Sequence, residues 1–451
     1  MAYILPFRAL RYDPLRVALP DVVTQPYDKI TLEMQDKYYS ASPHNLVRII
    51  LGRRQAADHE GDNAYSRAAA SFRDWRRQGI FLQDSQPSLY IYHQRFAAPG
   101  GKGDLERRGF IALGRIEDYS AGVVFRHEQT LAKPKADRLD LLRSTRAHFG
   151  QLFMLYSDAG HEIEGLLVPR NEPEIDVRDE YGVTHRVWRT SDPTLIELVR
   201  GKMRDKKLII ADGHHRYETA VAYRNERKVS LAAAAPGGGP RQHSPSELVR
   251  ASEAEDAPFE LVMMTFVNMG SPGLVILPTH RVVHGLPSFS SEGLQSEARR
   301  YFGVEDVDPS IDSYRASVIL REAGHAGMAL LAVTADRAFL LDRPKAGPEM
   351  FPGLSLKQQS LDVVQLHKCI LEGALGISED AIRNQQHVHY IRDAGEALAR
   401  VRSGQADAAF LMNPVRIEQV RDIAFAGDVL PQKSTDFYPK LLSGLTIYAL
   451  E

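Results

Sequence analysis

The chain contains little cysteine, little net charge and no long apolar run. Only one of its 451 residues is a cysteine, Cys369, so it forms no disulfide within itself and no zinc or iron–sulfur site built from several cysteines. No segment approaches the roughly 20 apolar residues that a membrane span requires. The 56 Lys and Arg residues nearly balance the 58 Asp and Glu residues, leaving a formal charge of −2. That balance argues against a nucleic-acid-binding protein with a broad basic surface.

The remaining composition is that of an ordinary globular protein, with 43% hydrophobic and 25% charged residues. The length predicts two or three domains at roughly 150 residues each. The N-terminal string M-A-Y-I-L-P-F-R lacks the basic and then apolar pattern of a signal peptide. We therefore expect a cytoplasmic protein that acts on a small molecule and has no membrane partner. The sequence leaves its oligomeric state open.

One segment, residues 232–257, is rich in Ala, Gly, Pro and Ser and has few large apolar residues. Such a composition does not bury enough apolar surface to offset its ordering entropy. It predicts a flexible linker or insertion between an N-terminal α/β lobe at 1–231 and a C-terminal α/β lobe at 258–451. Strand-like and helix-like patterns alternate in both lobes, so the fold class is α/β or mixed α+β. We expect strands at 45–51, 89–96, 110–116, 151–156, 261–267, 274–277, 328–333, 338–341 and 408–412, and helices at 62–78, 137–147, 361–371, 395–401 and 418–426.

A dense polar group follows the apolar run at 208–211. The string D-G-H-H-R occupies 212–216, and apolar residues at helical spacing come directly after it. The polar group is therefore predicted to lie where a strand ends and a helix begins. A helix start favours an anion, because its N–H groups are unpaired there and its dipole is positive.

Each residue of this string can contribute to binding an anion. Gly213 lets the backbone approach the anion closely, and Arg216 can clamp phosphate or carboxylate with two hydrogen bonds. His214 and His215 add further donors. Asp212 can orient a histidine or accept a proton, so Asp212 and His215 are candidate catalytic groups. A simple capped helix start is the alternative interpretation of the same pattern.

Several strings spread along the chain resemble the family catalogued as domain of unknown function 1015. They are P-F-R-A-L-R-Y-D-P at 6–14, Q-P-Y-D-K-I at 25–30, H-E-Q-T at 127–130, K-A-D-R-L at 135–139, A-D-G-H-H-R-Y-E-T-A at 211–220, L-P-T-H-R at 277–281 and Q-K-S-T-D-F-Y-P-K-L at 432–441. The set is specific, but the family name implies no activity.

The D-G-H-H-R string is also similar to a motif of the ParB/sulfiredoxin superfamily, so the first lobe is expected to contain an element of that kind. One branch of the superfamily contains free-serine kinases that use ADP or ATP, and there the motif contacts phosphate groups. The resemblance implies phosphate contacts for Gly213, His214, His215 and Arg216. Sulfiredoxin chemistry requires a reactive cysteine, whereas Cys369 lies on an apolar helical stripe and is expected to be a core residue.

A second polar patch contains Glu128 and the cations Lys133, Lys135 and Arg138. These residues suit phosphate or nucleotide binding, with Glu128 as the preferred general base, since phosphoryl transfer needs charge neutralisation, positioning and one base. A solvated loop before a helix is the alternative. A third patch, Lys433-Ser434-Thr435, can bind phosphate through an ammonium, hydroxyls and N–H groups, although it lacks Walker-loop spacing and also fits a surface turn.

Asp28, in Q-P-Y-D, can hold a substrate amine, or it can form an Asx turn. His280 and His284 have the spacing of zincin histidines without the glutamate, and a strand would separate them too far for one metal. We therefore predict no metal site formed by the protein alone.

Together these patterns favour a small-molecule phosphotransferase. Its expected cofactor is ADP or ATP with Mg²⁺, and its expected substrate is serine, or phosphoserine in the reverse direction. The alternatives are a nucleotide-binding regulator without chemistry and a phosphomonoester hydrolase.

Overall fold

A computed structural model describes residues 2–101, 103–128, 132–234 and 257–451. The chain divides into two compact units, one formed by residues 1–125, 130–275 and 439–451 and the other by 126–129 and 276–438. This division differs from the predicted boundary at 232–257, most of which lies outside the described residues. The strand that follows that segment belongs to the centre of the first unit's sheet, so the boundary falls after it.

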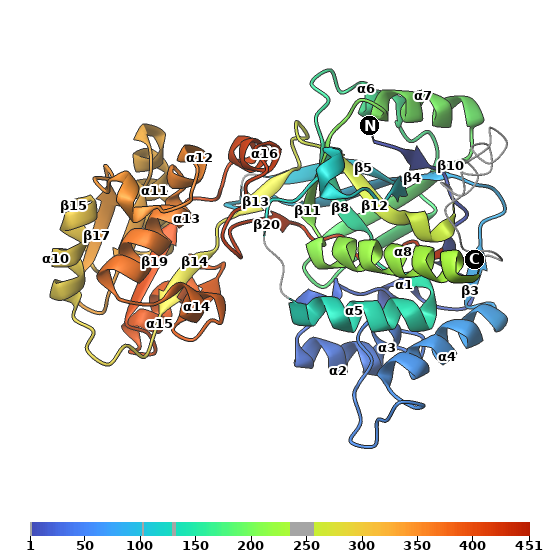
Figure 1. Cartoon of the computed structure of the whole chain (residues 1–451), viewed down its shortest axis with the longest axis horizontal. Coiled ribbons are helices and arrows are strands. Elements are labelled where there is room, and N and C mark those ends of the chain that lie inside the picture. The colour runs from blue at the N-terminus through green and yellow to red at the C-terminus, as the bar shows by residue number, and fades with distance from the viewer. Residues whose placement is uncertain (1, 102, 129–131, 235–256) are drawn as a thin grey trace. The chain divides into compact units, whose positions relative to one another are not determined.

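The first unit contains both strands and helices, which confirms the mixed α/β class (Figure 1). Its strands are β1 (Ile4–Leu5), β2 (Leu10–Tyr12), β3 (Phe81–Gln83), β4 (Leu89–Ala97), β5 (Asp104–Arg115), β6 (Val124–Phe125), β7 (Ala147–His148), β8 (Leu152–Tyr156), β9 (Ile175–Arg178), β10 (Thr184–Thr190), β11 (Leu208–Asp212), β12 (Leu261–Asn268) and β21 (Tyr448–Ala449). Its helices are α1 (Leu19–Val22), α2 (Leu32–Ala41), α3 (Val47–Ile50), α4 (Ala64–Arg77), α5 (Ala132–Thr145), α6 (Glu162–Leu166), α7 (Pro193–Met203) and α8 (His214–Ala234).

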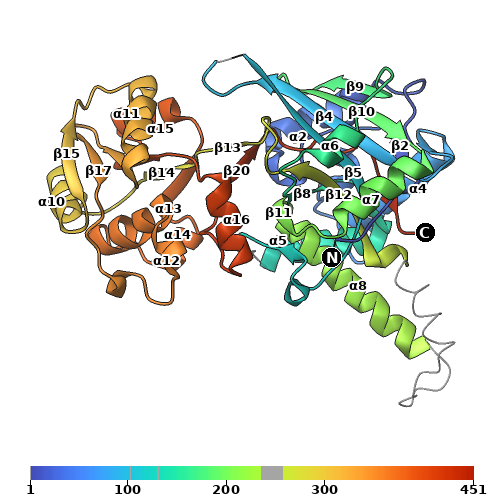
Figure 2. The ribbon, with the colours of Figure 1, turned by 90° about the horizontal axis from the view of Figure 1, so that it is seen from above.

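The main sheet of this unit runs in the order β6-β11-β8-β12-β5-β4-β10-β9, with β1 paired to β5. The strands β4 and β5 pair in antiparallel fashion, and β12 lies between β8 and β5. The apolar residues of β8 and β12 are buried because both strands lie inside the sheet. Apolar residues of helices α6, α7 and α8 pack against it. Two views of the ribbon show these helices beside the sheet (Figures 1 and 2).

One strand prediction in this unit is wrong. Residues 45–51 were expected to form a strand, but they contain the short helix α3. Val47, Ile49 and Ile50 are all buried, and a short apolar run that is buried all round has no periodicity to separate helix from strand. Asn45 decides the local structure, since its side chain accepts a hydrogen bond from the Val47 N–H.

The second unit is built on an antiparallel sheet in the order β15-β17-β16-β19-β14-β18. The strands are β14 (His280–Val283), β15 (Gly303–Val307), β16 (Leu330–Val333), β17 (Ala338–Asp342), β18 (Val388–Ile391) and β19 (Ala408–Met412), and β13 (Val275–Leu277) pairs with β20 (Asp436–Tyr438). The helices are α10 (Ser291–Tyr301), α11 (Ser313–Ala326), α12 (Leu356–Gln359), α13 (Asp362–Gln365), a π-helix (Leu366–Ala374), α14 (Glu379–Arg383), α15 (Ala394–Arg402) and α16 (Ile417–Phe425). Helices α11 and α15 cover one face of this sheet with apolar residues.

Candidate anion site at the end of β11

The polar string at 212–216 lies where strand β11 ends and helix α8 begins, as the sequence predicts. The first four residues of β11 are buried, and a bulge in its pairing with β8 precedes Asp212. Gly213 joins the two elements with a φ of +99°. This backbone conformation is one that residues with a Cβ rarely adopt, so the junction requires glycine.

The Arg216 guanidinium occupies a cradle formed by two glycines. A Cβ on Gly213 would lie 3.0 Å from Arg216 Nη2, and a Cβ on Gly150 would lie 3.1 Å from Nη1. Nη1 also donates a 2.8 Å hydrogen bond to the Gln151 carbonyl. Both glycines therefore leave the space that holds this cation in one position beside the start of α8.

Asp212 lies among positive charges. Lys440 Nζ is 3.3 Å from Asp212 Oδ2, and both side chains are largely buried, with 10% and 20% of their surface exposed. Burial by itself would raise the pKa of the Asp212 carboxyl, but Lys440, Arg216 and Lys29 outweigh burial and lower this pKa well below its usual range. Asp212 is consequently ionised, and the cations around it outnumber it.

A buried network of polar side chains positions the backbone on either side of Lys440. Gln94 Nε2 donates a 2.8 Å hydrogen bond to the Lys440 carbonyl, and Arg107 donates from Nη2 to the Pro439 carbonyl and from Nε to Gln94 Oε1 at 3.0 Å. The Leu442 N–H lies 3.4 Å from the Tyr92 hydroxyl. This C-terminal segment is thus held on strands β4 and β5, and the backbone position of Lys440 is fixed.

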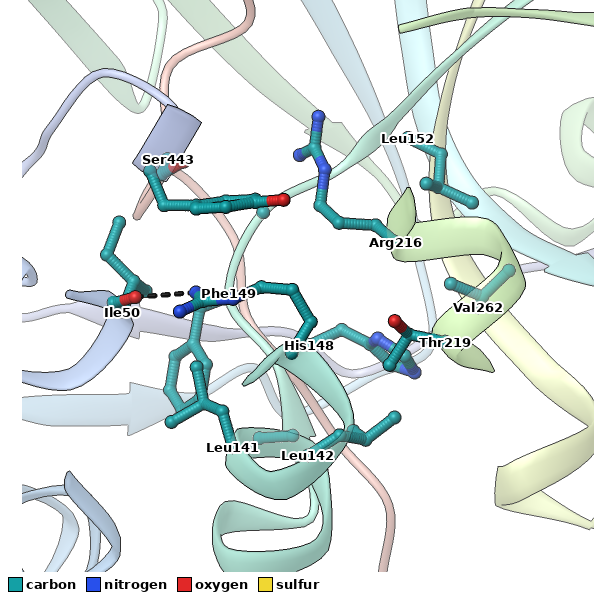
Figure 3. A pocket seen from close by; sticks show the side chains of 14 residues that line it. Ile50, Leu141, Leu142, His148, Phe149, Leu152, Arg216, Thr219, Val262 and Ser443 are labelled. Carbon is teal, nitrogen blue, oxygen red and sulfur yellow. Dashed lines mark hydrogen bonds between the residues drawn. The ribbon is translucent and has the colours of Figure 1, made fainter. Parts of the chain in front are cut away.

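A cavity of about 70 Å³ opens beside Arg216 (Figure 3). Thr219 and Arg216 extend into it from α8, and Ser443 reaches it from the C-terminal segment. Ser443 is 3% exposed, and its hydroxyl has no hydrogen bond to the described part of the chain. The space admits a few water-sized groups at roughly 10–15 Å³ each, which suits a small anionic group rather than a whole nucleotide.

Two further predicted residues lie around this cavity. Arg138 lines it, stacks at 4.1 Å on the Tyr27 ring and donates a 2.6 Å hydrogen bond to the Ile50 carbonyl. Burial is the main cause that raises the Tyr27 pKa, and Arg138, Arg216 and Asp212 also act on it, so the Q-P-Y-D loop faces the same junction. Asp28 in that loop is exposed.

The other predicted residues of this unit have varied surroundings. Lys135 pairs with Glu218 at 3.1 Å, so its ammonium already has a carboxylate. His214 is buried, with 8% of its surface exposed, and the His215 carbonyl accepts a hydrogen bond from Thr219. The side chain of Lys133 lies outside the described residues. Both Lys135 and Arg138 lie on α5, which begins at Ala132, earlier than the predicted helix.

Glu128 and the patch at 433–435 come together in the second unit. Glu128 Oε1 accepts a 3.2 Å hydrogen bond from the Lys433 N–H, and Glu128 pairs as an isolated bridge with Leu430. Ser434 donates to the Pro431 carbonyl at 2.5 Å. Thr435 lies 2.7 Å from Nε2 of the buried His127. The two hydroxyls therefore already have partners within the protein.

Several residues of the first-unit site were not predicted from the sequence. Lys440, Lys29 and Tyr27 surround Asp212 and Arg216, while Gly150 and Ser443 complete the cavity wall. A signal existed for three of them, because the Q-P-Y-D-K-I and Q-K-S-T-D-F-Y-P-K-L strings contain Tyr27, Lys29 and Lys440. No local pattern pointed to the other two.

Among the described residues, no group of three or more His, Cys, Asp or Glu side chains could hold a metal ion. The described helices include none that is long and apolar enough to cross a membrane.

Cys369 is fully buried, as expected for a core residue. His280 accepts a 3.3 Å hydrogen bond from the Met412 N–H, and His284 stacks on His389 at 4.1 Å.

A family model described as "Protein of unknown function (DUF1015)" matches residues 4–364. No curated protein matches the chain. Among solved structures, a conserved hypothetical protein from Pyrococcus furiosus is 11% identical, with 71% of this chain and 89% of that chain covered and a TM-score of 0.32.

Two further structures are similar at the same level. A free serine kinase in complex with AMP is 12% identical, with 70% of this chain and 83% of that chain covered and a TM-score of 0.32. SbnI with C-terminal truncation, from Staphylococcus aureus, is 10% identical, with 76% and 89% covered and a TM-score of 0.34. These similarities assign no role to any residue of this chain.

Proposed function

Because the chain belongs to the DUF1015 family, whose description states no activity, we propose a function from its own residues: it is a small-molecule phosphotransferase. The observation that carries this proposal is the cationic junction at Asp212. Arg216, Lys440 and Lys29 outnumber the single carboxylate there, and the start of α8 adds the positive end of its dipole. Such a junction suits the phosphate groups of a nucleotide.

The proposed reaction transfers the terminal phosphoryl group of ADP or ATP to the hydroxyl of serine. The hydroxyl oxygen forms the new P–O bond, the bond to the nucleotide breaks, and AMP or ADP leaves with the electron pair. The reverse reaction on phosphoserine uses the same groups. Mg²⁺ takes carboxylate oxygens together with nucleotide phosphates, and the ionised Asp212 fits it as a protein ligand.

The two carboxylates of the proposal have different tasks. A carboxyl whose pKa is strongly lowered is a weak base, so Asp212 is assigned to orient cations and the nucleotide-bound metal. Glu128 keeps its predicted role as the general base, and Lys133 and Lys433 to Thr435 remain proposed phosphate contacts; this part of the proposal rests on the sequence pattern alone. His215, in the first turn of α8, is proposed as a hydrogen-bond donor to the transferred group. Asp28 is proposed to bind the serine amine.

The test is an incubation of the full chain with serine, Mg²⁺ and ADP or ATP, followed by detection of phosphoserine and of the product nucleotide by mass spectrometry. We expect phosphoserine to form in equal amount with AMP or ADP. Arg216→Ala and Glu128→Gln should each reduce the rate at least about a hundredfold, as expected for loss of a phosphate clamp or a general base.

Arg227→Ala is the matched control, because Arg227 lies further along the same helix and away from the junction. Its activity should equal that of the unchanged chain. Failure to phosphorylate serine or any other hydroxyl amino acid would refute the kinase proposal. Release of inorganic phosphate from phosphoserine without a nucleotide would identify a hydrolase instead, and nucleotide binding without turnover would identify a regulator.

A further inference from the structure

A second cavity, of about 280 Å³, lies in the first unit at the other end of strand β8. Leu152, at the start of β8, lines the cavity beside Arg216, whereas Tyr156, at its end, lines this one. Four residues at roughly 3.3 Å each separate them by about 13 Å. The two cavities share no lining residue, so this one is separate from the anion site.

Two guanidinium groups lie along one side of this cavity. Arg108, His93 and Arg186 stand directly opposite one another on the neighbouring strands β5, β4 and β10. Arg108 Nε pairs with Glu106, and Arg186 Nε pairs with Asp176, at 2.8 and 2.9 Å. The Nη groups of both arginines have no hydrogen bond to the described part of the chain. They are therefore available to an anionic group such as a carboxylate.

Acceptor groups without partners line the rest of the wall. Tyr156 is 1% exposed, and its hydroxyl makes no hydrogen bond among the described residues. Glu164 Oε1 is buried without a partner, while its Oε2 lies 3.0 Å from His161 Nδ1. Burial lowers the His93 pKa to about 4, despite the Glu106 carboxylate 3.7 Å away, so the imidazole is neutral and has a nitrogen lone pair.

Buried polar atoms nearly always have hydrogen-bond partners, so the unpartnered Glu164 Oε1 indicates a donor group of an occupant. The Arg108 and Arg186 side chains are 58% and 39% exposed, so an anion can reach them from solvent. Trp188 and Phe110 add apolar surface to the cavity wall, and the Trp188 N–H is already bonded to the Asn171 carbonyl. The ring faces of these residues therefore suit an apolar group. The cavity is near the lower limit of the roughly 300–1,000 Å³ of small-molecule sites.

We propose that this cavity binds a small amino acid with an apolar side chain. Its carboxylate contacts Arg108 and Arg186, its ammonium group contacts Glu164 and Tyr156, and its side chain lies against Trp188. This binding is independent of nucleotide binding at the β11 junction.

The test is calorimetric titration of the full chain with L-leucine, L-methionine and L-phenylalanine. At least one should bind with a Kd of about 1 mM or tighter. Phenylalaninamide lacks the carboxylate and N-acetyl-phenylalanine lacks the ammonium group, so each should bind at least about tenfold more weakly than phenylalanine, because each leaves a charged group unpaired.

Arg186→Gln and Glu164→Gln should each weaken binding of the amino acid about tenfold or more. Arg216→Ala should leave it unchanged, which separates this site from the proposed phosphotransfer site. Unfolding midpoints close to that of the unchanged chain would establish that both glutamine variants are folded. Absence of binding by all three amino acids at about 10 mM, or full affinity in folded Glu164→Gln, would overturn the proposal.

Discussion

Replacing Gly213 by alanine tests the conformation at the end of β11 directly. The φ of +99° costs a residue with a Cβ about 1–2 kcal/mol. The new methyl group would lie 2.9 Å from Leu152 Cδ2 and 3.0 Å from Arg216 Nη2, so both side chains must shift. Adding about 1 kcal/mol for that displacement, we expect Gly213→Ala to lower the free energy of unfolding by about 2–3 kcal/mol.

Gly201→Ala is the matched control for this experiment. Gly201 lies in α7, and a Cβ there would meet no atom within 4 Å. Alanine should therefore stabilise that helix by about 0.5–1 kcal/mol. Both variants replace glycine by alanine, but Gly213→Ala is expected to lower the free energy of unfolding and Gly201→Ala to raise it.

Urea unfolding followed by tryptophan fluorescence measures the effect in the relevant unit. The chain has two tryptophans, Trp75 and Trp188, and both belong to the first unit. Equal stability of Gly213→Ala and Gly201→Ala would refute the conformational argument. Anion binding offers a second readout, since displacement of Arg216 should weaken it even where the fold persists.

Three other outcomes follow from burial and charge. Burial raises the Cys369 thiol pKa to about 12, so iodoacetamide should modify this residue only after denaturation, and Cys369→Ala should retain activity; rapid labelling of the native chain would contradict this. Burial, with Arg281 adding to it, lowers the His280 pKa to about 4. The unfolded state gains this proton near pH 6.5, so His280 alone should lower the free energy of unfolding by about 1.4 kcal/mol for each unit that the pH falls between about 6.5 and 4. Circular dichroism should show a smaller slope in His280→Gln. Lys440→Met should raise the Asp212 pKa and weaken nucleotide binding, measured by calorimetry; unchanged affinity would exclude Lys440 from the site.

The sequence predicts much of the fold because burial imposes a regular pattern on long elements. The apolar residues of β12 and β19 form runs bounded by polar residues, and the structure has strands there. Helix α3 was not predicted because a helix of four residues, three of them buried, is too short to show a helical period. The sequence pattern also does not indicate the division into units, because this division depends on the insertion of β12 into the middle of a sheet.

Part of the candidate site could likewise be identified from the sequence, and part could not. Asp212, Gly213 and Arg216 are adjacent in sequence, so turn chemistry and helix-start electrostatics suffice to identify them. Lys440 reaches Asp212 only through tertiary structure, and its position depends on a buried network that includes Arg107. Such contacts between distant segments leave no spacing that a single sequence reveals.

The path of the chain through the two units has a consequence for synthesis. The first unit takes its last segment, residues 439–451, from the chain after the whole second unit has been traversed. A ribosome therefore completes 276–438 before it supplies Lys440 and Ser443. Until then the junction at Asp212 lacks the Lys440 ammonium group and the part of the cavity wall that Ser443 forms. Assembly of this site is delayed until residues 439–451 have been made, and no contiguous fragment that stops at residue 275 contains the complete site.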